Sequence, residues 1–106
     1  MQLYPLKLVT VVGETVIMED IAEEGVKLGA TGFTLSEVVG EGSRSARNVA
    51  ATTGPKTMKL EFVVPTEVAT AILTHVSQQY FEHYAVIAWL SDVQVVRGQQ
   101  YTKAGK

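Results

Sequence analysis

The residues best suited to chemistry lie between positions 40 and 47, in the stretch GEGSRSAR. Two glycines free the backbone to turn its amides inward, and inward amides form a concavity that binds anions. A serine adds a hydroxyl donor, and two arginines three positions apart supply forked donors that match phosphate oxygens. These residues are Gly40, Gly42, Ser43, Arg44 and Arg47. The pattern predicts an anion site, whereas the alternative is a solvated loop, and composition alone favours neither.

Enzyme chemistry finds little support elsewhere in the chain. His75 and His83 lie eight positions apart with no cysteine, which favours surface or helix-end histidines over a metal site. The acidic pairs Glu19–Asp20 and Glu23–Glu24 are typical of the solvated face of a helix. Ser43 lacks the G-x-S-x-G context of a nucleophile. We therefore expect no catalytic residues and no metal.

The length and composition of the chain predict one small globular domain spanning residues 1–106. The chain has a net charge of −2 and 46% hydrophobic residues, which disfavours nucleic acid as the main ligand. It has no cysteine, which fits a reducing compartment. The N-terminus lacks the pattern of a signal peptide, and no apolar run approaches the roughly 20 residues of a spanning helix. We expect a soluble cytoplasmic protein.

Hydrophobic periodicity predicts two helices and four strands. In the first helix Ile17, Ile21 and Leu28 form one apolar stripe, and Gly29 stands where a helix commonly ends. Thr66 is the expected N-cap of the second helix. The predicted elements are a strand at 6–12, a helix at 14–28, strands at 31–39 and 57–64, a helix at 65–81 and a strand at 84–96, broken near Ser91–Asp92.

The order β-α-β, loop, β-α-β predicts an α+β, ferredoxin-like sandwich with both helices on one face of an antiparallel sheet. We call residues 40–57, the loop between the two halves, the switch loop, because an unstructured loop of this length is usually functional. Residues 97–106 form a polar tail. Val63, Ile87 and Trp89 are candidates for the uncovered face of the sheet, which indicates an oligomer. Tyr80 and Tyr84 are expected in the core or an interface.

Nearly the whole chain resembles the PII-like carbon-sensing signalling proteins, which include the SbtB proteins and the carboxysome-associated PII proteins. The similarity rests on LGATGFTLSEVVGEGSRSAR, KLEFVVP and YFEHYAVIAWLSDVQVVRG. It implies a homotrimer with a nucleotide in each cleft between subunits, and it makes the switch loop the segment that closes over ligand and meets partners. The implied ligands are AMP, ADP, ATP or cyclic AMP, together with bicarbonate.

Carried over by position, the resemblance implies a nucleotide site built from two groups of residues. The phosphate group is Gly42, Ser43, Arg44 and Arg47, and the group near the adenine and ribose is Thr34, Ala85 and Val86. The switch loop has no tyrosine, so it cannot be uridylylated, and the tail lacks the cysteines of a redox-controlled segment. Nucleotide hydrolysis is therefore not expected.

The predicted function is a non-enzymatic trimer that senses adenine nucleotides, responds to bicarbonate and regulates a bicarbonate transporter or another membrane partner. A structural trimer of the CutA type, which shares the fold, is the main alternative. A nucleic-acid binder would need a basic face with exposed aromatics, and a phosphoryl-transfer enzyme would need carboxylates for magnesium. The sequence supports these two alternatives less well.

Overall fold

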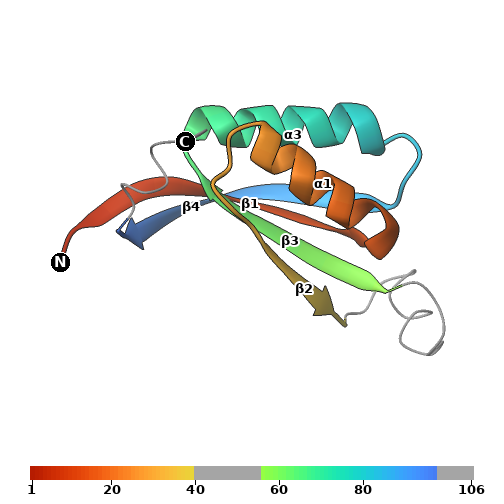
Figure 1. Ribbon diagram of the computed structural model, residues 1–106, viewed down its shortest axis with the longest axis horizontal. Helices are drawn as coiled ribbons and strands as arrows, with labels where there is room; N and C mark the ends of the chain where they lie inside the picture. The colour runs from red at the N-terminus through yellow and green to blue at the C-terminus, as the bar shows by residue number, and fades with distance from the viewer. Residues whose placement is uncertain (40–55, 98–106) are drawn as a thin grey trace.

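The computed structural model describes residues 1–39 and 56–97. Both helices lie on one face of a twisted sheet (Figure 1). The four strands are ordered β2-β3-β1-β4, and each neighbouring pair is antiparallel. The elements are β1 (Leu3–Glu14), α1 (Thr15–Lys27), β2 (Thr34–Val38), β3 (Thr57–Val64), α3 (Thr66–Tyr80) and β4 (Val86–Val96). This arrangement confirms the predicted α+β, ferredoxin-like βαββαβ fold.

The core fills the space between the helices and the sheet. Alternation in β1 and β3 sends every second side chain toward the helices, and the two helices close over them with their apolar stripes. Met18, Ala22 and Gly25 also belong to the buried face of α1. The largest fully buried side chains are Phe62, Met18, Ile21, Leu60, Ile72, Val9, Val11, Val64 and Val76.

The face of the sheet away from the helices, which we call the open face, carries the side chains that the sequence assigned to it. Trp89 pairs with Thr10, Ile87 with Val12 and Val63 with Leu8. Val9 and Val11, the neighbours of these β1 residues, belong to the helix-facing core, so the paired residues point to the opposite side. Trp89 is 44% exposed and Ile87 is 59% exposed.

The ends of the helices correct two predictions. Pro65 is the N-cap of α3 and no side chain caps the helix, so the assignment of Thr66 as N-cap was wrong. Leu28, predicted to share the apolar stripe of the first helix with Ile17 and Ile21, is instead the C-cap of α1 and is exposed. Gly29 follows with φ of 126°, which confirms that the chain there needs a residue tolerant of positive φ.

Strand pairing corrects three strand boundaries. β4 runs without a break, because Ser91 and Asp92 pair in register with Leu8 and Lys7, and Lys7 also forms an ion pair with Asp92. β1 is longer than predicted, since its partner β4 extends the pairing out to Leu3. β2 begins only at Thr34.

Residues 40–55, most of the switch loop, and residues 98–106, most of the tail, lie outside the described residues. The predicted extent of the single domain, of the loop and of the tail therefore remains a prediction. Among the described residues, neither helix is long and apolar enough to cross a membrane.

Candidate functional site

Thr34 opens β2 and borders a shallow pocket. Its cross-strand neighbour is Glu61 of β3, so both side chains leave the sheet on the open face. The pocket has a volume of about 540 Å³ and is lined by Leu8, Thr31, Gly32, Phe33, Thr34, Glu61 and Val63. Apolar walls with a few hydroxyl and carboxylate groups are typical of sites for small molecules.

Ala85 and Val86 lie at the opposite edge of the sheet, where β4 begins. Val86 pairs with Gly13 of β1, and a methyl group placed on Gly13 would lie 3.3 Å from Cγ2 of Val86. The side chain of Val86 is therefore packed closely against the backbone of β1. Ala85 precedes it, at the end of the turn that leaves α3.

The described residues that border the gap in the switch loop lie at the same end of the sheet as Val86. Val38, the last residue of β2, pairs with Thr57, the first of β3, while Gly13 pairs with Met58. The carbonyl of Lys56 accepts hydrogen bonds from the backbone N–H and the hydroxyl of Thr15, both at 3.1 Å. The start of α1 thus holds the exit of the switch loop.

One chain alone does not bring Thr34 and Val86 together. Two strands, β3 and β1, separate β2 from β4. Three strand spacings of about 4.8 Å put the two edges about 14 Å apart. Each edge therefore carries only part of the predicted site.

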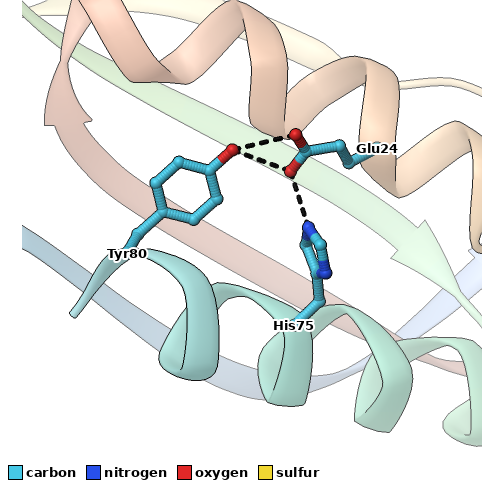
Figure 2. A network of polar contacts seen from close by, with 3 residues as sticks. All are labelled: Glu24, His75 and Tyr80. Carbon is cyan, nitrogen blue, oxygen red and sulfur yellow. Dashed lines mark hydrogen bonds and ion pairs between the residues drawn. The ribbon is translucent and has the colours of Figure 1, made fainter. Parts of the chain in front are cut away.

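A network of polar contacts connects α1 and α3 where the two helices face each other (Figure 2). The Glu24 carboxylate accepts hydrogen bonds from the Tyr80 hydroxyl, at 2.8 and 2.9 Å to its two oxygens, and lies 2.7 Å from Nε2 of His75. Burial raises the pKa of Tyr80 well above its usual range. The hydrogen bond to the Glu24 carboxylate and the charge of that carboxylate raise the pKa further. Glu24, predicted on the solvated face, and His75, predicted as a surface or helix-end histidine, are each about one third exposed, and the helix packing pairs these two side chains. Glu23 is exposed, as predicted.

Within residues 1–39 and 56–97, no group of three or more His, Cys, Asp and Glu side chains gathers to hold a metal. A second pocket of about 370 Å³ contains the Lys7–Asp92 ion pair beside the first residue of α3. Its one cation is already paired with a carboxylate, so it offers no unpaired charge to an anion.

A family model described as nitrogen regulatory protein P-II matches residues 6–100 of the chain. The chain belongs to the P-II family. A structure from Thermus thermophilus, described as a PII-like signaling protein, is 42% identical with a TM-score of 0.80, covering 96% of this chain and all of that one. CPII from Thiomonas intermedia K12, bound to ADP, AMP and bicarbonate, is 26% identical with a TM-score of 0.71, covering 91% and 98%.

CutA from Synechococcus elongatus PCC7942 is 12% identical with a TM-score of 0.67, and the match covers 93% of each chain. At this identity the similarity concerns the fold alone. The P-II family match confirms the resemblance to PII-like proteins that the sequence indicated.

Of the site residues predicted for this P-II family chain, the described ones fall on two edges: Thr34 on one, Ala85 and Val86 on the other. Gly42, Ser43, Arg44 and Arg47 lie outside the described residues, so their roles remain predictions. The sequence interpretation did not assign Glu61 or the segment Thr31–Phe33 to the site. Alternation in β3 pointed Glu61 away from the core, but only the β2–β3 register places it beside Thr34.

Proposed function

We propose that this P-II family chain is a PII-like signal-transduction protein of the cytoplasm that binds adenine nucleotides in clefts between the subunits of a homotrimer. AMP and ADP are the expected ligands, ATP and cyclic AMP are further candidates, and bicarbonate is a second effector. The protein catalyses no reaction. Nucleotide binding changes the switch loop, and a partner responds to that change.

The observation that carries this proposal is the position of Thr34 and Val86 on opposite edges of the sheet. In a closed ring of identical subunits, each interface joins one edge of a subunit to the other edge of its neighbour. The β2 edge of one copy then meets the β4 edge of the next. The pocket beside Thr34 and the Ala85–Val86 backbone would line one cleft, which a single chain cannot form.

The open face supports assembly independently. Ile87 and Trp89 are large, apolar and about half exposed there, beside Leu8, Val12 and Val63. An apolar sheet face of this kind gains free energy when another surface covers it. A trimer with its three sheets turned inward would bury all of these side chains.

Two relatives support the proposal, one for signalling and one for the choice of ligand. The Thermus thermophilus protein, at 42% identity, is described as a signaling protein of the PII-like group. CPII from Thiomonas intermedia K12 binds ADP, AMP and bicarbonate, and it shares the fold over 91% of this chain. Hydroxyl, carboxylate and apolar groups in the pocket beside Thr34 suit the base and the sugar of such a nucleotide.

The switch loop provides the chemistry for the phosphates. Arg44 and Arg47 can each donate two hydrogen bonds to phosphate oxygens, and Gly42 and Ser43 add backbone and hydroxyl donors. We propose that the phosphates hold residues 42–47 and thereby order the rest of the loop. A nucleotide can shift the loop only by its difference in affinity for the two loop states, so related nucleotides give different outputs.

Isothermal titration calorimetry of the full chain with AMP, ADP, ATP and cyclic AMP, each with and without bicarbonate, tests the proposal. We expect one binding site per chain, with bicarbonate changing the affinity of at least one nucleotide. Chromatography of the incubated nucleotides should show no turnover. Absence of binding by all four nucleotides would reject the function.

A CutA-type structural trimer is the second candidate, because CutA shares the fold with a TM-score of 0.67. Both candidates predict a trimer, but only the signalling protein predicts nucleotide binding. A thermal-shift screen separates them. A melting temperature that rises with ADP supports the signalling protein, and one that no adenine nucleotide moves supports the CutA type.

We further propose that the partner is a bicarbonate transporter or another membrane protein of inorganic-carbon uptake. The bicarbonate bound to CPII supports a link to inorganic carbon. Uptake of labelled bicarbonate in the source organism, with and without the gene, tests this part. We expect the uptake rate to depend on the gene, and an unchanged rate would contradict the pathway without affecting nucleotide binding.

A further inference from the structure

The turn that follows α3 leads into the Ala85–Val86 backbone, and Tyr80 contacts this turn through both its backbone and its ring. Its carbonyl oxygen accepts hydrogen bonds from the backbone N–H groups of His83, at 3.3 Å, and Tyr84, at 3.0 Å. Both bonds are made directly before Ala85. The backbone of the last residue of α3 is therefore hydrogen-bonded to the turn that follows the helix.

The side chain of Tyr80 acts on the same turn. Its ring packs against the ring of Tyr84, with centroids 5.8 Å apart and an interplanar angle of 53°. Its hydroxyl donates to the Glu24 carboxylate of α1, and the His75 ring meets its ring edge to face, with centroids 6.2 Å apart (Figure 2). Tyr80 is therefore fixed at both ends, by α1 at its hydroxyl and by the turn at its backbone.

The other side of Ala85 is also held. Val86 packs against Gly13 so closely that a methyl group on Gly13 would lie 3.3 Å from Cγ2 of Val86. Ala85 thus lies between Tyr84, which contacts the Tyr80 ring, and Val86, which contacts β1. A backbone held on both sides can present its polar groups to a ligand without a further ordering cost.

We propose that Tyr80, held by Glu24, is the positioning residue for the nucleotide-binding backbone at Ala85–Val86. It need not touch the nucleotide itself. The inference rests on the proposed function, because it concerns the same cleft. It assigns the Glu24–Tyr80 contact a role beyond joining two helices, since a contact between helices alone would leave the turn unchanged when it is removed.

The first measurement needs no ligand. Backbone amide resonances of Ala85 and Val86 are compared by NMR in the wild type, Tyr80→Phe and Glu24→Gln. Matched controls are Tyr4→Phe, which removes an exposed hydroxyl bonded to Gln2, and Glu23→Gln, which neutralises the exposed carboxylate next to Glu24. We expect both test variants to shift the two amides, while both controls leave them in place.

The second measurement is ADP affinity at a temperature where every variant is folded. Loss of one hydrogen bond that positions a binding group should weaken ADP binding by about 3–10-fold in Tyr80→Phe. Tyr84→Ala removes the ring contact downstream of Tyr80 and should weaken binding at least as much. Because the two residues act in sequence, the double variant should bind ADP no more weakly than Tyr84→Ala alone.

Failure of this inference differs from failure of the proposed function. If the wild type binds no adenine nucleotide, the function fails, and the amide shifts alone decide whether Tyr80 sets the turn. If ADP binds but Tyr80→Phe changes neither the affinity nor the Ala85 and Val86 amides more than Tyr4→Phe does, the inference is overturned. Shifts spread evenly over both helices would also overturn it, since they indicate general loosening.

Discussion

The hydroxyl of Tyr80 lies 2.8 and 2.9 Å from the two carboxylate oxygens of Glu24, and this contact joins the end of α3 to the last turn of α1. The two residues are 56 positions apart in the chain. The contact is half-buried and is shared with His75. It is a polar contact at the edge of an otherwise apolar interface between the two helices.

Removing this hydroxyl should lower stability measurably. A hydrogen bond to a charged group contributes about 1.5–3 kcal/mol. The Glu24 side chain is 32% exposed. Water therefore compensates part of the loss, and we expect Tyr80→Phe to reduce the free energy of unfolding by about 1 kcal/mol. Urea denaturation measures it, with Tyr4→Phe as the control that should change little. Equal urea midpoints for Tyr80→Phe and Tyr4→Phe would contradict a stabilising role for the Tyr80–Glu24 contact.

The raised pKa of Tyr80 predicts a loss of stability at alkaline pH. Burial is the main cause, followed by the hydrogen bond and charge of Glu24. An unfolded tyrosine ionises near pH 10, whereas the folded protein keeps the Tyr80 proton well above that. The contribution is therefore complete below about pH 10 and is lost as pH rises further. Between about pH 10 and 11.5, the free energy of unfolding should fall less steeply in Tyr80→Phe than in the wild type. Equal slopes of the unfolding free energy against pH in the wild type and Tyr80→Phe would contradict a raised pKa at Tyr80.

Gly25 is required by the close approach of α1 to the sheet. A methyl group at this position would lie 2.3 Å from Cζ of Phe62, which is fully buried. Overpacking a core costs about 1–3 kcal/mol, and alanine regains up to about 1 kcal/mol in a helix. The overlap at 2.3 Å puts the cost at the upper end of this range, so Gly25→Ala should be destabilised by a net amount of about 2 kcal/mol in urea denaturation.

Gly32→Ala is the matched control for Gly25→Ala. A methyl group at Gly32 meets nothing within 4 Å. Its stability should stay within about 0.5 kcal/mol of the wild type. If Gly25→Ala were as stable as this control, the packing of α1 against Phe62 would be looser than described.

The open face should determine assembly. Trp89→Glu places a charge beside Ile87 on the open face, and burying an unpaired charge is costly, so we expect the proposed trimer to dissociate. Light scattering coupled to size-exclusion chromatography measures the mass. Gln94→Glu adds the same charge to the opposite face of β4 and should leave the trimer intact. If Trp89→Glu remained a trimer, the subunit interface would not include the open face around Trp89.

The arginines of the switch loop should dominate phosphate affinity. If Arg47 donates to the phosphate as proposed, Arg47→Ala should weaken AMP or ADP binding by about 1.5–3 kcal/mol, the contribution of a charge-assisted hydrogen bond. Arg44→Lys should also weaken binding, since an ammonium group cannot reproduce the guanidinium fork. Calorimetry measures both, with the exposed Lys27 changed to alanine as the control. An affinity unchanged in Arg47→Ala would remove that residue from the site.

The order of strands and helices could be predicted from the sequence because it depends on local periodicity. Residues 57–64 alternate so regularly that the predicted strand has the same bounds as β3. The turn at Gly29 was equally local. Predictions at other boundaries failed where pairing partners decide the length, as at Leu3 in β1 and at Ser91–Asp92 in β4.

The sequence by itself determined the fold class, the family resemblance and the faces of the strands. Only the tertiary structure decided which distant residues meet. It placed Glu61 beside Thr34 through the β2–β3 register, paired Glu24 with His75 and Tyr80, and put Thr34 and Val86 on opposite edges of one sheet. Side-chain periodicity shows which way a residue points, but it does not show which partner stands opposite. That choice depends on strand order, register and helix packing, which are properties of the whole fold.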